Sequence, residues 1–280
     1  MPSEAETSLT IFLEKSHGGT TLVWSPPCMR GTQPVPPSSE MPVRLGLPGR
    51  LEPPPYSSRC DFIIVSSEVI IPSEAAMLRG TLTVPDGAST LVLFAHGSGS
   101  SRHSPRNQFV ARTLNGARLA TLLLGLLTRE EEAVDAHTAQ HRFNISLLAE
   151  RLVHATKWAM DQPSTRELSL AYFGASTGGG AALVAAAELP RDIGAVVSRG
   201  GRPDLAGDAL PKVQAPTLLI VGGEDDVVIT LNEQARARMQ CEVKLEIVPG
   251  ATHLFEEPGA LERVAQLATD WFLHRTLPKR

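Results

Sequence analysis

The sequence predicts one α/β domain, built on a mostly parallel, twisted sheet with helices on both faces. Continuous apolar runs bounded by turn residues indicate strands that are buried on both faces. Segments with apolar residues at helical spacing alternate with these runs, and such alternation builds a parallel sheet covered by helices. Only short stretches separate the predicted elements, so we expect little or no cap domain.

The predicted elements follow one another along residues 59–280. An antiparallel pair comes first, because "DFIIVSSEVIIPS" and "LRGTLTVP" alternate apolar and polar residues as half-buried strands do. Buried strands are then expected at 90–97, 119–127, 168–176, 194–201, 216–225 and 244–253. Helices are expected at 105–116, 143–162, 177–188, 230–240 and 257–275. The polar stretch "REEEAVDAHTAQH" is interpreted as a solvated segment.

The first 58 residues are expected to form an irregular or disordered extension. Of the 22 prolines in the chain, 11 lie within the first 55 residues, and proline has no backbone N–H for regular hydrogen bonding. A mis-assigned start, with translation beginning at Met29 or Met41, is the alternative explanation, and the sequence does not separate the two.

Composition and charge favour a soluble protein that acts on a small molecule. A hydrophobic content of 42% can form a core, and a net charge of −4 gives no general attraction to nucleic acid or to an anionic membrane. Three cysteines without a CxxC pair predict a reduced, cytoplasmic setting, and no stretch has the length of a membrane-spanning helix. We expect a small-molecule substrate and neither nucleic acid nor membrane as partner; a homodimer is compatible with the sequence.

A candidate nucleophile, Ser176, stands at the end of a predicted strand. It occupies the centre of Gly174-Ala175-Ser176-Thr177-Gly178, between the strand "LSLAYFGA" and the helix "TGGGAALVAAAEL". GxSxG at a strand-to-helix junction is typical of a nucleophile elbow, whose tight turn needs nearly side-chain-free positions two residues before and after the serine. A glycine–serine turn without catalytic function is the alternative, and the flanking strand and helix favour catalysis.

A base and an acid follow Ser176 in the order typical of α/β-hydrolases, which is serine, aspartate, histidine. His253, in the loop "VPGATHLFEEPG", is the candidate base, and Asp225 is the candidate acid that orients it. We prefer Asp225 to Asp226, because a turn from Gly222 would direct Asp225 to the edge of the sheet, whereas Asp226 is expected to face solvent. Surface positions without function are the alternative for all three.

The tetrahedral intermediate of acyl transfer needs hydrogen-bond donors for its oxyanion. We expect them to be the backbone N–H of Thr177, in the elbow, and that of Ser98, in the Gly/Ser loop after the strand "TLVLFAHG". A flexible turn is the alternative for this loop. A phosphate-binding loop is excluded, because no GxxxxGK[ST] pattern follows.

From about Val69 to Leu277 the chain resembles the dienelactone hydrolase-like branch of the α/β-hydrolases. The segments that carry the resemblance are "LVLFAHGSGSSRHSPRN", "GASTGGGAA", "SRGGRPDLAG", "PTLLIVGGEDDVV" and "VPGATHLFEEPGAL". The resemblance implies Ser176 as nucleophile, Asp225 as acid and His253 as base. Dienelactone hydrolases have a cysteine nucleophile, whereas this elbow holds serine, so the resemblance supports the fold and the triad but not dienelactone as substrate.

Together these motifs predict a serine hydrolase that cleaves a small carboxylic ester or lactone through an acyl-enzyme. About fifteen residues separate Gly201 from Pro216, where related enzymes often insert a lid, so we expect an open site. A thioesterase, an acyltransferase or a peptidase with the same triad, or a non-catalytic binding protein, are the alternatives. No cofactor is expected, because the triad needs only water. His137 and His141 are spaced i, i+4 but lack a third ligand, so no metal site is expected.

Four basic side chains near the expected strand ends are candidates for substrate binding. Arg199 and Arg202 lie in "SRGGRPD", and Arg102 and His103 lie in the proposed oxyanion loop. The hypothesis is that an arginine holds a substrate carboxylate by two hydrogen bonds. A structural ion pair, such as one between Arg202 and Asp204, is the alternative.

Overall fold

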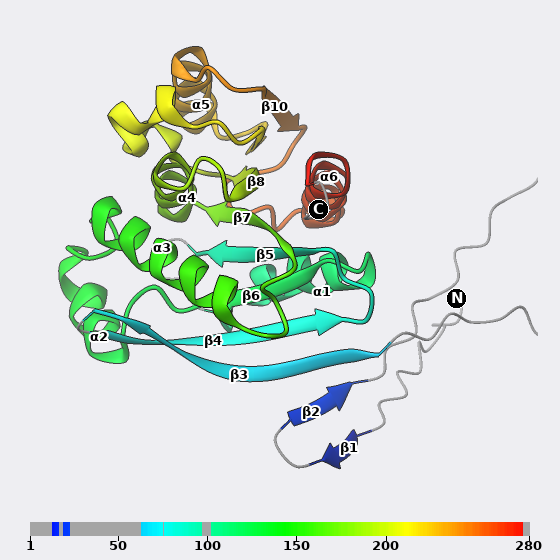
Figure 1. Cartoon of the computed structure of the whole chain (residues 1–280). Coiled ribbons are helices and arrows are strands. Elements are labelled where there is room, and N and C mark those ends of the chain that lie inside the picture. Colours follow the sequence, from blue (N-terminus) through cyan, green and yellow to red (C-terminus); the bar gives the residue numbers. More distant parts are fainter. Residues whose placement is uncertain (1–12, 17–18, 23–62, 75, 97–101, 277–280) are drawn as a thin grey trace, which may run out of the picture.

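The computed structural model describes residues 13–16, 19–22, 63–74, 76–96 and 102–276. Within these residues one sheet of 10 strands forms, in the order β1-β2-β3-β4-β6-β5-β7-β8-β9-β10 (Figure 1). The strands are β1 (Leu13–Ser16), β2 (Gly19–Leu22), β3 (Ile64–Ser73), β4 (Ala76–Pro85), β5 (Thr90–Ala95), β6 (Ala120–Leu124), β7 (Ser169–Ala175), β8 (Ile193–Arg199), β9 (Thr217–Gly222) and β10 (Val243–Val248). The helices are α1 (Pro105–Gly116), α2 (Arg129–Thr138), α3 (Ile145–Asp161), α4 (Thr177–Glu188), the 3₁₀ segment η1 (Pro203–Lys212), α5 (Asp226–Arg238) and α6 (Ala260–Arg275).

The sheet is parallel from β6 through β10 and antiparallel at its other end. β3 and β4 form the expected half-buried hairpin, in register from Ile64 opposite Pro85 to Ser73 opposite Ala76, and β4 pairs antiparallel with β6. β1 and β2 extend the sheet beside β3, inside the segment predicted as an irregular extension. The rest of residues 1–58 lies outside the described residues, so the predicted extent of that extension stays a prediction.

Helices cover both faces of the sheet, as the sequence predicts (Figure 1). One hydrophobic cluster packs the sheet against α3, α4 and η1, and a second packs it against α1 and α6. The central strands β5, β7 and β9 are buried along their whole length, which explains their continuous apolar runs. In the second cluster the rings of Phe94 and Phe173 lie 4.8 Å apart, on neighbouring strands.

Residues 129–138 of "REEEAVDAHTAQH" form α2, a helix that the sequence did not predict, and most of its side chains are exposed, as expected of a solvated segment. The Thr128 side chain accepts a hydrogen bond from the N–H of Glu131, and the Glu131 carboxylate accepts one from the N–H of Thr128. Glu131 also receives two hydrogen bonds of 2.6 Å from the guanidinium of Arg151 on α3. Capping and this ion pair stabilise a helix that has no apolar face.

The connection between β8 and β9 contains η1, which packs against α4 and α5. No separate cap domain interrupts the fold between these strands, so the described residues form a single α/β domain as predicted. None of the helices in the described part of the chain combines the length and the apolar composition needed to cross a membrane.

Candidate active site

The backbone of Ser176 adopts a conformation that residues with side chains rarely take, with φ 52° and ψ −125°, between β7 and α4. Three backbone hydrogen bonds hold it. The Ser176 N–H donates to the carbonyl of Arg199 (3.3 Å), and the Ser176 carbonyl accepts from the N–H groups of Gly179 (2.9 Å) and Arg202 (3.0 Å). The strain of the elbow is therefore held by the end of β8 and by the first turn of α4.

The glycines that flank the serine are required by close backbone contacts. A Cβ atom at Gly174 would lie 2.6 Å from the carbonyl oxygen of Gly178, and a Cβ at Gly178 would lie 2.1 Å from that of Ala95 on β5. Both distances are far shorter than a van der Waals contact. The spacing of GxSxG in this chain thus follows from packing of the elbow against its own helix and against β5.

The side chains of His253 and Asp225 meet after the ends of β10 and β9. The Nδ1 atom of His253 lies 2.6 Å from Oδ2 of Asp225, and the two side chains are 39% and 16% exposed. This bond fixes the tautomer in which Nδ1–H donates to the carboxylate and Nε2 is left to accept a proton. Asp226 is the exposed first residue of α5, as expected.

The loop that carries the aspartate packs directly on the loop that carries the histidine. The N–H of Asp225 donates to the carbonyl of Gly222 (3.1 Å), which closes the turn inferred from the sequence. A Cβ at Gly222 would lie 2.4 Å from the carbonyl oxygen of Ala251 and 2.6 Å from that of Thr252. Glycine at this position therefore lets the two loops approach closely enough for the aspartate–histidine bond.

Residues at the end of β8 contact both the serine and the histidine. Its last residue, Arg199, accepts the hydrogen bond from Ser176, while a Cβ at Gly200 would lie 3.1 Å from the carbonyl oxygen of His253 and 3.6 Å from its ring Cε1. Gly200 has a positive φ of 49°, which glycine adopts readily. Ser176, His253 and Asp225 thus lie together at the carboxyl edge of the parallel strands.

Of the two expected oxyanion donors, the structure describes only Thr177. It is the first residue of α4 and is buried, so its N–H lies at the positive end of the helix dipole. Ser98 lies outside the described residues. Next to that loop, Nε2 of His96 accepts a hydrogen bond of 3.2 Å from the N–H of Leu126, which links the ends of β5 and β6.

The candidate substrate-binding side chains have different surroundings. Arg102 forms an ion pair with Glu68 on β3 and lies 3.3 Å from the hydroxyl of Thr81 on β4. Arg202 donates to both carboxylate oxygens of Asp204, at 2.9 and 2.8 Å, which is the structural ion pair considered as an alternative. Arg199 is buried against the ring of Phe255.

A cavity of about 810 Å³ opens beside this edge, between the β3–β4 turn, α2 and α3. Arg102 and His103 line it, together with Gly125 and side chains of α2 and α3. The catalytic candidates Ser176, Asp225 and His253 are not among its lining residues, so the cavity does not enclose the proposed reaction centre.

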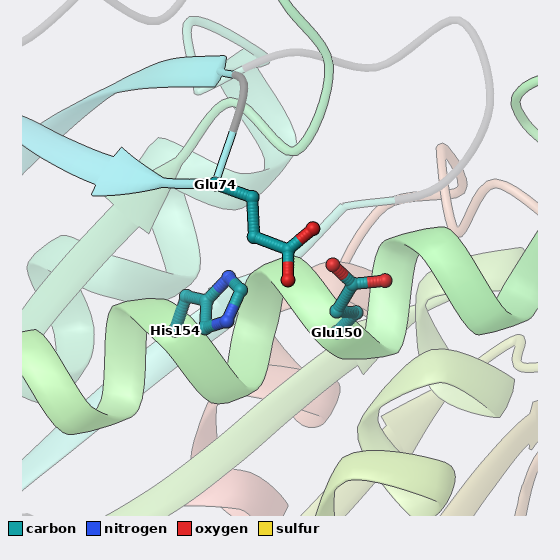
Figure 2. A group of neighbouring side chains, drawn as sticks. All are labelled: Glu74, Glu150 and His154. Carbon is teal, nitrogen blue, oxygen red and sulfur yellow. The ribbon is translucent and has the colours of Figure 1, made fainter.

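One group of metal-ligand side chains gathers near this cavity, in the described part of the chain. Oxygen or nitrogen atoms of Glu74, Glu150 and His154 lie within 4.8 Å of one another, and Nδ1 of His154 lies 2.8 Å from the hydroxyl of Ser73 (Figure 2). Sequence reasoning missed this group because the β3–β4 turn and α3 are far apart in the chain. Both carboxylates are exposed, and exposed carboxylates are common without an ion, so the group alone does not define a metal site.

A doubly covered parallel sheet with a GxSxG elbow and an aspartate-bound histidine at its carboxyl edge defines the α/β-hydrolase class. The model of the dienelactone hydrolase family matches residues 120–275, which is more than half of the chain. The chain therefore belongs to the dienelactone hydrolase family, as the resemblance implied.

Similar proteins agree with this membership. A crystal structure of a dienelactone hydrolase from Anabaena variabilis is 59% identical, with a TM-score of 0.74, over 76% of this chain and 98% of that chain. Est1E from Butyrivibrio proteoclasticus, at 17% identity and a TM-score of 0.63 over 74% of this chain and 98% of its own, shares the fold. Two Mycobacterium tuberculosis proteins, provisionally named phosphoribosyl transferases, are 58% identical over 206 residues, 74% of this chain and 46% of theirs. The chain thus spans about half the length of these curated relatives.

Proposed function

We propose that the protein is a serine hydrolase that cleaves a small carboxylic ester or lactone through an acyl-enzyme. The observation that carries this proposal is the 2.6 Å bond between His253 and Asp225, at the edge where Ser176 stands in its strained elbow. Membership of the dienelactone hydrolase family supports a hydrolase. The serine nucleophile, in place of that family's cysteine, supports a substrate other than dienelactone.

The proposed reaction uses Ser176 as the attacking group. Its hydroxyl adds to the carbonyl carbon of the ester while Nε2 of His253 takes the hydroxyl proton, and Asp225 stabilises the imidazolium that forms. The N–H groups of Thr177 and Ser98 receive the oxyanion. His253 then protonates the departing alkoxide, and in the second half it takes a proton from the water that attacks the acyl-enzyme.

The connection between β8 and β9 supports the proposal of a small substrate. η1 packs on α4 and α5, so this connection does not extend into a cap that would hold a long acyl chain. Phosphoribosyl transfer is named for the tuberculosis proteins, and this chain covers 46% of them. The serine, histidine and aspartate of the present site instead favour attack on an acyl carbon.

A substrate panel with a matched pair of variants tests the proposal. Wild type, Ser176→Ala and the control Ser89→Ala, which changes an exposed serine between β4 and β5, are assayed on p-nitrophenyl esters, lactones, acyl thioesters and peptide amides. We expect short esters or lactones to be cleaved fastest and kcat to fall by about 10⁵-fold or more in Ser176→Ala only. Retained activity in Ser176→Ala would contradict the proposal, and faster thioester or amide cleavage would reassign the substrate class.

A further inference from the structure

The guanidinium group of Arg199, the last residue of β8, is buried, and two of its three nitrogens have no acceptor among the described residues. The side chain is 7% exposed, and its Nε and Nη1 atoms have no hydrogen-bond partner among the residues that the structure describes. Its guanidinium carbon lies 5.9 Å from the centre of the Phe255 ring, a cation–π contact that offsets part of the charge but accepts no conventional N–H hydrogen bond. A buried cation with unpaired donors is costly unless an anion or water occupies the space beside it.

A second arginine adds to this positive charge. Arg106, in the first turn of α1, donates to the exposed carboxylate of Glu256 (2.8 Å), while its Nε is buried and unpaired among the described residues. Burial first, and then the charge of Arg106, lower the pKa of Arg199 to about 10. On β8, Arg199 lies on the same face as Ala195 and Val197, which pack beneath α1 and α6, so both arginines belong to this face of the sheet.

The two arginines lie beside the proposed reaction centre. Arg199 is paired in register with Ala175, the residue before Ser176, and its carbonyl accepts the N–H of Ser176. Phe255, which lies against the Arg199 guanidinium, follows His253 by two residues. Both arginines thus contact the segment that follows the candidate base, Arg199 through Phe255 and Arg106 through Glu256.

From these contacts we propose that Arg199 and Arg106 form a subsite for an anionic group, a carboxylate or a phosphate, of the ester that Ser176 attacks. Guanidinium groups match both anions with paired N–H donors. The inference rests on the proposed ester hydrolase function and names its substrate class. It also separates Arg199, which has no carboxylate partner among the described residues, from Arg102 and Arg202, which are paired with Glu68 and Asp204. Arg106 was not among the side chains considered from the sequence.

A matched pair of substrates tests the subsite. The mono-p-nitrophenyl ester of glutaric acid ends in a carboxylate, and p-nitrophenyl valerate has the same chain length without the charge. We expect Arg199→Gln and Arg106→Gln to lower kcat/KM for the glutarate ester by about 10- to 100-fold and for the valerate by less than ~3-fold. Arg112→Gln, an exposed arginine on the same helix α1, should change neither. Equal losses on both esters, or no loss, would overturn the proposal.

Binding to a catalytically inactive protein separates failure of the subsite from failure of the proposed function. Thermal denaturation of Ser176→Ala is followed with glutarate and, separately, with inorganic phosphate. We expect one of these anions to raise the Tm, which identifies the anion class, and the rise to disappear when Arg199→Gln is added. This result would stand even if wild type cleaved no ester. No rise with either anion would show that the site binds no anion, and an equal rise without the Arg199 guanidinium would show that the anion binds elsewhere; either result would overturn the proposal.

Arg106→Gln and Arg199→Lys keep both experiments decisive if Arg199→Gln does not fold. Arg106→Gln removes the second charge at a partly exposed position. Arg199→Lys keeps the charge at the first position but loses the paired N–H donors. Either variant should weaken the anion-dependent rise in Tm and the preference for the glutarate ester, and an unchanged response in both variants would contradict the proposal.

Discussion

Replacing Asp225 by asparagine is expected to remove most of the activity while the fold is kept. The Asp225 carboxylate lies 2.6 Å from Nδ1 of His253 and therefore holds the proton on that nitrogen. An asparagine amide can donate to Nδ1 instead, which places the ring proton on Nε2, the atom that must accept the proton of Ser176. With the base in the wrong tautomer, we expect kcat to fall about 10⁴-fold, equivalent to about 5 kcal/mol in the barrier.

The neighbouring residue provides the control for this prediction. Asp226 has the same chemistry but is the exposed first residue of α5, so Asp226→Asn should change kcat by less than ~3-fold. Both variants are assayed on the best ester of the panel, with thermal denaturation to verify folding. Equal activity of the two variants, or a folded Asp225→Asn protein that keeps a tenth of wild-type kcat, would refute the assignment of the acid.

Three further predictions concern stability. Arg199→Met replaces a buried guanidinium with unpaired nitrogens by an apolar side chain, so urea denaturation of the ligand-free protein should show a gain of about 1–4 kcal/mol; a loss would mean that the charge is compensated. Gly178→Ala places a Cβ 2.1 Å from the carbonyl oxygen of Ala95, and we expect the free energy of unfolding to fall by about 1–3 kcal/mol together with esterase activity, whereas an unchanged Tm and rate would contradict the steric argument. Hydrogen bonds from Arg151 lower the pKa of Glu131 from 4.5 to about 2. Between pH 4.5 and pH 2 the unfolded chain therefore binds more protons at this carboxylate than the folded protein does. Glu131→Gln should therefore be less stable than wild type at pH 7, and the difference should shrink as pH falls from 4.5 toward 2; a difference that does not change over this range would contradict the ion-pair account.

The buried strands could be predicted because their surroundings are encoded locally. β7 is apolar along its whole length because both of its faces are covered, and the structure gives Ser169–Ala175 where the sequence predicts 168–176. The turn that directs Asp225 toward His253 could be inferred in the same way, since it closes over four consecutive residues from Gly222. Motifs contained within one strand and the turn after it can thus be predicted from the sequence.

Features that depend on several distant segments were not predicted. α2 has no apolar face, although Thr128 followed by Glu131 at the capping-box spacing is a signal that could have indicated its start. α5 begins at Asp226 and not at residue 230, because the chain turns directly from the aspartate loop into the helix. Arg199 at the end of β8 and Arg106 at the start of α1 contact the consecutive residues Phe255 and Glu256, and only the folded chain brings these segments together.

We propose that Ser176 is a nucleophile activated by His253 and Asp225. The most direct measurement is covalent labelling of the folded protein with a fluorophosphonate probe, followed by peptide mass spectrometry to identify the modified residue. We expect one labelled residue, Ser176, with strongly reduced labelling in His253→Ala. Folded wild-type protein whose Ser176 stays unlabelled, or is labelled equally well without the His253 side chain, would contradict it.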